Sequence, residues 1–154
     1  MEHLGNKDIL NNYKTDFLSS RKCPAEVVLN SYEWAKRQRA EGNCVVCGTH
    51  SQIEKDVFEI LLKGVQPLVL VLPRGLKKRW DKSWIENIEK GRLLIVSPFS
   101  KNVTRVTRET AILKNETILG ISDQIVVGYK SPNGQLDRLL TNLKFDQVHL
   151  LVKV

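Results

Sequence analysis

Short runs of small, polar and basic residues in this sequence have the composition of a phosphate-binding site. Residues 20–22 read Ser-Arg-Lys and are followed by Pro24, which suits the first turn of a helix. An arginine offers a phosphate a fork of two N–H donors, and the free amides at a helix start add further donors. Residues 48–51, which read Gly-Thr-His-Ser, form a second such run after an apolar stretch. The chemistry that these runs indicate is anion binding.

The same runs contain groups that act as catalysts in other proteins. His50 is a potential general base, and Ser20 and Ser51 are potential nucleophiles. A serine nucleophile would need an adjacent base. Ser51 and Glu54 instead have the Ser-x-x-Glu spacing of a capping box. We therefore expect binding and helix capping from these residues, and we predict no enzyme activity.

Cys44 and Cys47 form a Cys-x-x-Cys pair, a spacing that also occurs in metal and redox sites. Their run, Cys-Val-Val-Cys, is typical of a strand, in which residues three apart point to opposite faces. The three histidines are scattered, at positions 3, 50 and 149. We therefore expect buried structural thiols, and we predict no metal site and no cofactor.

The densest basic cluster covers residues 74–79, Arg-Gly-Leu-Lys-Lys-Arg, directly before Trp80. Lysine and arginine could hold a nucleic-acid backbone there while a base stacks on the tryptophan. Trp80 and Trp84 lie four residues apart on a predicted helix, so we expect at least one of them in the core. A solvated basic loop is the alternative interpretation.

Six apolar runs alternate with stretches of helical periodicity, the pattern of a doubly wound α/β domain. The run 67–73 is apolar throughout, as is typical of a strand buried on both faces at the centre of a sheet. A lead-in helix is predicted over residues 1–12. Strands are predicted at residues 15–18, 44–47, 67–73, 93–96, 124–129 and 148–152, with helices at 24–40, 51–63, 80–89, 104–119 and 135–143. The predicted fold is a Rossmann-like three-layer sandwich around a mostly parallel sheet of about six strands.

Right-handed crossovers place all the strand-to-helix turns at one edge of such a sheet. These turns are residues 20–23, 48–51, 74–78, 97–104 and 131–134. Their small, polar and basic side chains are what a phosphate cradle requires. We therefore expect the site at this edge.

The composition, 42% hydrophobic and 27% charged, is typical of one globular domain over residues 1–154. A net charge of +7 is compatible with an anionic partner such as nucleic acid. No apolar run approaches the roughly 18 residues that cross a bilayer, and the first residues lack the layout of a signal peptide. Three cysteines, an odd number, suit a reducing compartment. We expect a cytoplasmic protein without membrane association.

With these turns in place, the chain resembles the DNA-processing protein family DprA/Smf, in a Rossmann-like superfamily that also contains the LOG-type, lysine decarboxylase-like nucleotide hydrolases. The resemblance extends from Gly5 to Leu140. Residues 5–10 are similar to the family's Gly-Asn-x-x-Leu-Leu, residues 20–22 to its Gly-Ser-Arg-Lys, residues 45–54 to its Val-Val-Ser-Gly…Gly-Ile-Asp, residues 114–123 to its Arg-Asn…Gly-Leu-Ser-Asp, and residues 133–134 to its Ser-Gly.

This resemblance implies binding of single-stranded DNA by basic residues at the turn edge, with no known catalysis. The chain departs from the family where Ser51 and Gln52 replace an Arg and a Gly, and where Phe58 replaces a His. We expect no helix-turn-helix domain. The charge that holds a phosphate must then come chiefly from Arg21, Lys22 and Lys114.

LOG-type hydrolases carry Pro-Gly-Gly-x-Gly-Thr-x-x-Glu at the last strand–helix turn, and the final Glu transfers protons. On residues 132–140 of this chain, that motif places Leu140 at the Glu position. A leucine cannot transfer protons, which argues against a hydrolase unless Asp137 or Glu109 substitutes.

The sequence thus predicts non-catalytic binding of a phosphate-rich ligand, foremost single-stranded DNA in DNA processing, uptake or recombination. The alternatives are binding of a nucleotide or nucleotide-derived signal, with or without weak LOG-like phosphoribohydrolase activity, and a surface that recruits a protein partner. We also expect a homo-oligomer. The predicted ligand-binding residues are Ser20, Arg21, Lys22, Gly48, Thr49, His50, Ser51, Arg74, Lys114, Asn115, Asn133 and Gly134.

Overall fold

Apolar runs form the three inner strands of the central sheet, seen in a computed structural model that describes residues 1–141 and 148–151. Its strands are β1 (Glu2–Leu4), β2 (Lys14–Asp16), β3 (Cys44–Cys47), β4 (Leu68–Val71) and β5 (Leu93–Ser97). The order across the sheet is β1-β5-β4-β3-β2. Strands β2 to β5 pair in parallel, whereas β1 runs antiparallel to β5. Strand β4 is buried at the centre, as its apolar run predicted.

Strands β6 (Ile125–Val127) and β7 (Val148–Leu150) form a separate parallel pair beside β2. Only isolated bridges, at Thr15–Gln124 and Leu18–Val127, join β6 to the segment of β2. The amide of Val126 donates to the side chain of Asp16, at 3.1 Å, and this bond takes the place of a backbone ladder bond. The prediction of one mostly parallel sheet of about six strands is therefore wrong. The described sheet has five strands and is mixed.

The predicted lead-in helix over residues 1–12 is also wrong. Residues 2–4 form β1 on the free edge of β5, and only Lys7–Asn11 is helical, as the 3-10 helix η1. Gly5 separates them with φ +114°, and a Cβ there would lie 2.5 Å from the carbonyl oxygen of Leu93. The local sequence gave no sign of this break, because the pairing of β1 with the edge of β5 is a long-range feature.

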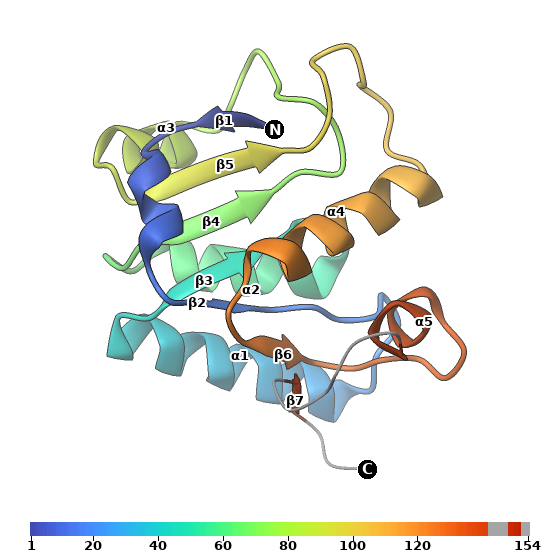
Figure 1. The fold of residues 1–154 in the computed structure, drawn as a ribbon. Helices are drawn as coiled ribbons and strands as arrows, with labels where there is room; N and C mark the ends of the chain where they lie inside the picture. Colours follow the sequence, from blue (N-terminus) through green and yellow to red (C-terminus); the bar gives the residue numbers. More distant parts are fainter. Residues whose placement is uncertain (142–147, 152–154) are drawn as a thin grey trace.

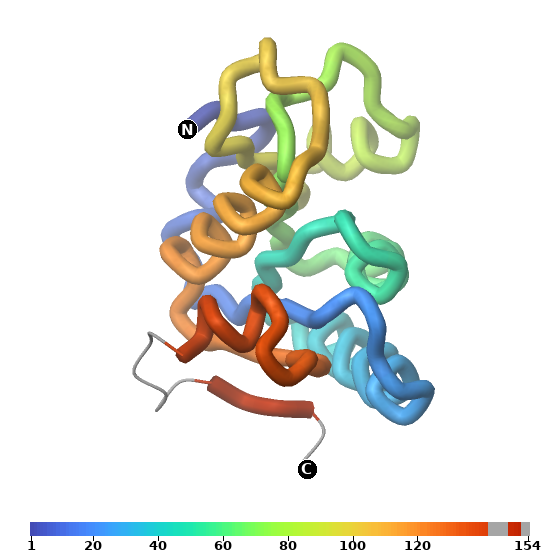
Figure 2. The backbone as a smooth tube through the Cα atoms, turned by 90° about the vertical axis from the view of Figure 1, so that its right-hand side faces the viewer, coloured from blue at the N-terminus to red at the C-terminus, as the bar shows by residue number. Residues whose placement is uncertain are grey.

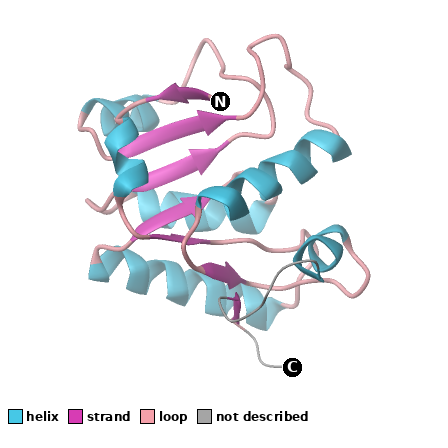
Figure 3. Ribbon diagram, viewed as in Figure 1, coloured by secondary structure: helices cyan, strands magenta, loops and turns pink. Residues whose placement is uncertain are grey.

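Helices cover both faces of the sheet (Figures 1 and 3). Helices α1 (Ala25–Glu41), α2 (Gln52–Leu62) and α3 (Lys82–Glu89) pack on one face. Helices η1, α4 (Arg108–Ile121) and α5 (Gln135–Thr141) pack on the other. Gly42 ends α1 in the left-handed conformation, at φ +77°. Helices α3 and α4 begin later than predicted, and the predicted ends at Leu143 and Val152 lie outside the described residues.

The two faces carry two apolar cores, and alternate residues of β3, β4 and β5 contribute to them. Cys47 belongs to the core under α1 and α2, and Cys44 belongs to the core on the opposite face. This confirms that the two thiols point apart, and burial raises the pKa of both. Trp34 of α1 is buried and stacks on Phe17 with ring centroids 5.4 Å apart.

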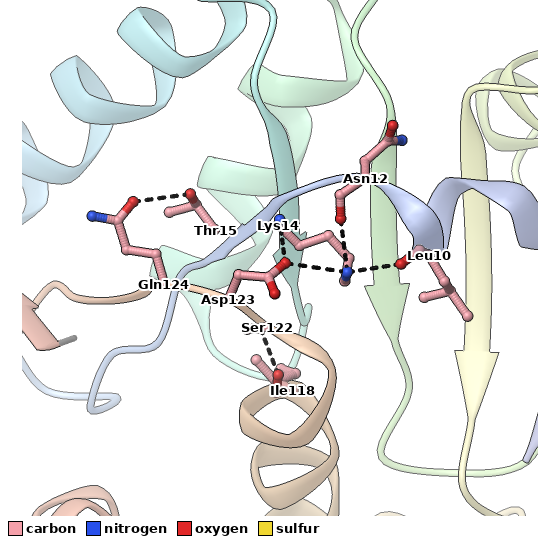
Figure 4. A network of polar contacts seen from close by, with 8 residues as sticks. All are labelled: Leu10, Asn12, Lys14, Thr15, Ile118, Ser122, Asp123 and Gln124. Atoms are coloured by element: carbon pink, nitrogen blue, oxygen red, sulfur yellow. Dashed lines mark hydrogen bonds and ion pairs between the residues drawn. The ribbon is translucent and has the colours of Figure 1, made fainter. Parts of the chain in front are cut away.

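The buried side chain of Lys14, at the amino end of β2, connects η1 to the segment that leads into β6 (Figure 4). The ammonium of Lys14 donates to the carbonyls of Leu10 and Asn12, both at 2.8 Å, and to the carboxylate of Asp123 at 3.3 Å. The backbone amide of Lys14 donates to the same carboxylate, which lowers the pKa of Asp123. These bonds hold η1, β2 and the start of β6 together at the edge opposite the strand-to-helix turns.

Candidate functional site

A cleft of about 880 Å³ lies at the carboxyl ends of β2 and β3, between α4 and the start of α5. Figure 2 looks onto this edge. It shows the blue segment after β2 and the teal segment after β3, and α4, in orange, lies at the same edge. The cleft is lined by Ser19, Ser20, Arg21, Lys22, His50, Glu54, Val106, Thr107, Arg108, Ala111, Lys114, Asn115, Ser131, Gly134, Gln135 and Leu136. The predicted edge is therefore the one that contains the cleft.

Three exposed cations surround the opening: Arg21 and Lys22 after β2, and Arg108 at the start of α4. None of the three forms an ion pair with any other residue that the structure describes. Uncompensated positive charges at the rim of a concave site attract anions and concentrate them there. The rim is thus suited to phosphate groups.

The floor of the cleft is a buried ion pair. The ammonium of Lys114 on α4 lies 2.8 Å from a carboxylate oxygen of Glu54 on α2, and both side chains are almost fully buried. The other carboxylate oxygen of Glu54 accepts bonds from the amide and the hydroxyl of Ser51, both at 3.1 Å. These bonds complete the predicted capping box. Lys114 was expected to supply charge to a ligand, but its charge is balanced by Glu54.

Gly48 provides the space for this ion pair. A Cβ at that position would lie 2.8 Å from the ammonium of Lys114 and 2.8 Å from a carboxylate oxygen of Glu54. Gly48 and Ser51 are buried and do not line the cleft. Both residues therefore contact the ion pair in the floor but do not reach the cleft itself.

His50 projects into the cleft from the turn after β3 and is half-buried. Burial lowers the pKa of His50 below its usual 6.5, and the nearby cations Lys114 and Arg21 lower it further against the opposing effect of Glu54. The imidazole is therefore neutral at pH 7. In this form it can accept or donate one hydrogen bond to a ligand.

The loop after β2 and the loop before α5 are hydrogen-bonded to each other at the wall of the cleft that faces α4. The amide of Ser20 donates to the carbonyl of Tyr129 at 2.7 Å, and the hydroxyl of Ser20 accepts from the amide of Ser131 at 2.9 Å. These bonds hold the segment that carries Arg21 against the turn before α5. The position of Arg21 is therefore set by contacts between segments more than 100 residues apart.

The structure brings together seven of the twelve predicted residues. Those that line the cleft are Ser20, Arg21, Lys22, His50, Lys114, Asn115 and Gly134. Thr49, Arg74 and Asn133 do not line it, nor do the supporting Gly48 and Ser51. Asn133 faces away in a left-handed turn, at φ +59°, where its amide donates to Asp137.

Sequence reasoning missed Arg108, whose exposed charge lies at the rim. Arg108 precedes Ala111 by three residues, and Ala111 precedes Lys114 by three, so each residue neighbours the next on the surface of a helix. Helical periodicity counted back from Lys114 could therefore have identified both residues.

The positions proposed for LOG-like acid–base chemistry do not place a free carboxylic acid in the cleft. Leu140 is fully buried. Asp137 accepts a bond from the amide of Asn133 at 2.9 Å and pairs with Lys130 at 3.4 Å, and both interactions lower the pKa of Asp137. Among the described residues there is also no group of three or more His, Cys, Asp or Glu side chains that could hold a metal ion. None of the described helices has the length and apolar composition that a bilayer span requires.

The sequence matches no protein-family model and no curated protein. Solved structures are nevertheless similar to it. DNA processing protein A (DprA) from Helicobacter pylori, whose single-stranded DNA binding mode has been described, superposes with a TM-score of 0.74 at 15% identity, over 96% of this chain and 69% of that one. DprA from Streptococcus pneumoniae superposes with a TM-score of 0.69 at 16% identity, over 90% of this chain and 50% of that one.

The molybdenum cofactor binding protein of Rippkaea orientalis is a more distant structural relative. It has a TM-score of 0.55 at 12% identity, over 90% of this chain and 76% of that one. The present chain spans only half the length of the S. pneumoniae protein. Over nearly its whole length, the chain has the Rossmann-like fold of the DprA proteins.

Proposed function

We propose that this protein binds single-stranded DNA in the cleft and that it acts in DNA processing, uptake or recombination. The observation that carries the proposal is the group of three exposed cations, Arg21, Lys22 and Arg108, around a concave opening, none of which is paired with a described residue. Phosphate contacts of this kind supply most of the sequence-independent affinity for nucleic acids.

The floor of the cleft makes these cations effective. The carboxylate of Glu54 would repel a phosphate, but Lys114 neutralises it at 2.8 Å. The positive field of the rim is therefore not cancelled from below. The shared fold with H. pylori DprA, whose structure concerns single-stranded DNA binding, adds support to this ligand class.

A small nucleotide-derived ligand is the second candidate. The volume of about 880 Å³ is within the range of small-molecule sites, which are typically about 300–1,000 Å³. The weaker similarity to a molybdenum cofactor binding protein points in the same direction. Such a ligand would occupy the cleft without using charges outside it.

The test is the affinity for a fluorescently labelled single-stranded oligonucleotide, measured by anisotropy at about 50 and 200 mM salt. We expect affinity to fall steeply with salt. Arg21→Ala should weaken binding and reduce the slope of log affinity against log salt by about 0.7, the value for one lost single-strand phosphate contact. Arg37→Ala removes the same charge from an exposed position on α1 outside the cleft, and it should leave the slope unchanged.

An absence of binding at low salt would refute the proposal. The second candidate is then tested by thermal-shift screening of nucleotides, because a bound ligand raises the melting temperature by mass action. A shift that Arg21→Ala abolishes would assign the cleft to a small ligand.

We also infer that the protein self-associates, since two copies would present two clefts to one strand and gain avidity. Light scattering at several protein concentrations measures this. A monomer at all concentrations would contradict the inference.

A further inference from the structure

The loops that follow β4 and β5 carry exposed cations that lie outside the cleft. Lys77, Lys78 and Arg79 are exposed in the first loop, and Lys101 and Arg105 are exposed in the second. None of these five residues forms an ion pair within the part of the chain that the structure describes. We call these five residues the loop cations. Such charges are stabilised by an anionic partner or by water.

Contacts between the two loops make them one surface. The amide of Gly75 donates to the carbonyl of Val103 at 2.8 Å, and the hydroxyl of Ser97 donates to the carbonyl of Arg74 at 2.7 Å. Gly75 also lies so close to the backbone of Ser100 that no side chain could be accommodated there. The loop cations are therefore held beside one another by backbone packing.

This surface continues into the cleft. The second loop leads from Lys101 and Arg105 directly to Val106 and Arg108, which line the cleft. Figures 1 and 2 show both loops at the edge of the sheet where β4 and β5 end, and the start of α4, which lines the cleft, lies at the same edge. Because neighbouring strands are about 4.8 Å apart, the ends of β2 and β4, two strands apart, are separated by roughly 10 Å. A ligand that reaches both must be longer than one phosphate group.

An aromatic residue adjoins the loop cations. Trp80 follows Arg79 directly, and its ring centroid lies 6.0 Å from that of Trp84. Both tryptophans pack against the core and are only partly buried. The prediction that at least one of them belongs to the core agrees with this packing, but part of the Trp80 ring remains open. Bases of a single strand stack on such rings while cations hold the backbone.

We propose that the loop cations and Trp80 form a second binding region, which takes the backbone of a single-stranded nucleic acid where it leaves the cleft. This inference rests on the proposed function. It adds that the binding site is longer than the cleft and that affinity therefore depends on strand length.

The experiment compares labelled oligothymidylates of about four and about 16 nucleotides, lengths that span the usual single-strand site sizes. The variant is Lys77→Ala/Lys78→Ala/Arg79→Ala. We expect it to bind the long strand at least about tenfold more weakly at low salt, with a salt slope smaller by about 2, for three lost contacts. Its affinity for the short strand should equal that of the parent.

The matched control is Arg37→Ala/Lys63→Ala/Lys90→Ala, which removes three exposed cations at or near the carboxyl ends of α1, α2 and α3. It has the same net charge as the variant and should bind both strands as the parent does, apart from a small general effect of charge. Circular dichroism melting checks that both variants are folded.

The outcomes separate the two proposals. If the variant binds the long strand as tightly as the control does, the second region is refuted while binding in the cleft stands. An equal weakening for short and long strands also refutes it, because the loop cations would then belong to the primary site. If the parent binds neither strand at low salt, the proposed function fails and this inference fails with it.

Discussion

At the scale of single residues, Glu54 determines how the floor of the cleft is built. One of its carboxylate oxygens caps α2 through Ser51, and the other accepts the ammonium of Lys114. The two partners are 60 residues apart in the sequence, on α2 and α4. The ion pair therefore fixes the position of α4, and with it that of Arg108, relative to the end of β3.

Lys114→Met is expected to lower the free energy of unfolding by about 3–5 kcal/mol, because it leaves the buried carboxylate of Glu54 without its partner. The double variant Glu54→Gln/Lys114→Met should recover most of this loss. Glutamine retains the capping-box bond and carries no charge. Urea unfolding of the parent and both variants measures the difference.

Lys22→Met is the control, since it removes an exposed cation that forms no ion pair with a described residue. It should change stability by less than about 0.5 kcal/mol. A single Lys114 variant as stable as the double one would show that the ion pair does not hold the floor.

At the scale of elements, the helix starts and the loop contacts have different origins. The starts of α2 and α4 are local, because Ser51 and Thr107 each cap a helix through a residue three positions later. The pairing of the loops after β4 and β5 is not local. It depends on Gly75, whose missing side chain allows the backbone of Ser100 to approach.

Gly75→Ala should therefore force the two loops apart. We expect a loss of about 1–3 kcal/mol in the free energy of unfolding, as for other insertions of a methyl group into packed sites. We also expect weaker binding of the long oligonucleotide, because the loop cations would separate. The measurements are urea unfolding and anisotropy.

Gly120→Ala provides the comparison, since nothing lies within 4 Å of a Cβ at this helical position. It should be neutral or stabilising by up to about 1 kcal/mol, the difference in helix propensity. Equal effects of the two substitutions would mean that Gly75 is not needed for the loop contact.

At the scale of the whole molecule, the seam between the five-stranded sheet and the β6–β7 pair contains a buried carboxyl group. Asp16 is fully buried, and burial raises its pKa from 3.8 to about 8, against the opposing effect of the hydrogen bond from the Val126 amide. The folded protein therefore keeps a proton on Asp16 at neutral pH, whereas the unfolded chain does not.

This difference makes stability depend on pH with a definite sign. Between about pH 4 and pH 8 the folded state binds the extra proton, so the free energy of unfolding falls as pH rises, by at most about 1.4 kcal/mol per pH unit. Asp16→Asn should remove this slope and make the protein more stable than the parent near pH 8. Urea unfolding at about pH 5 and pH 8 measures both effects.

Asp123→Asn serves as the control on the same seam. The pKa of Asp123 is lowered by its bond from the amide of Lys14, so its contribution to stability is lost only as pH falls below the usual carboxyl range. It should leave the slope between pH 5 and pH 8 unchanged. If the parent and Asp16→Asn showed the same pH dependence in this interval, Asp16 would be ionised in the folded protein.

Local patterns in the sequence determined much of the framework. The apolar run of β4 predicted a strand buried at the centre, and the Ser51–Glu54 spacing predicted a helix start. These features depend on residues a few positions apart, which is why periodicity reveals them. The crossover rule for parallel strands then placed the site at the carboxyl edge, where the cleft is found.

Only the tertiary structure decided which distant segments meet. It added β1 to the free edge of β5, separated β6 from β2 at Asp16, and paired Lys114 with Glu54. It also turned Asn133 away from the cleft and brought Arg108 to its rim. Each of these contacts depends on which unpaired edge or charge lies opposite in the folded chain. The spacing of residues along one segment carries no information about that partner.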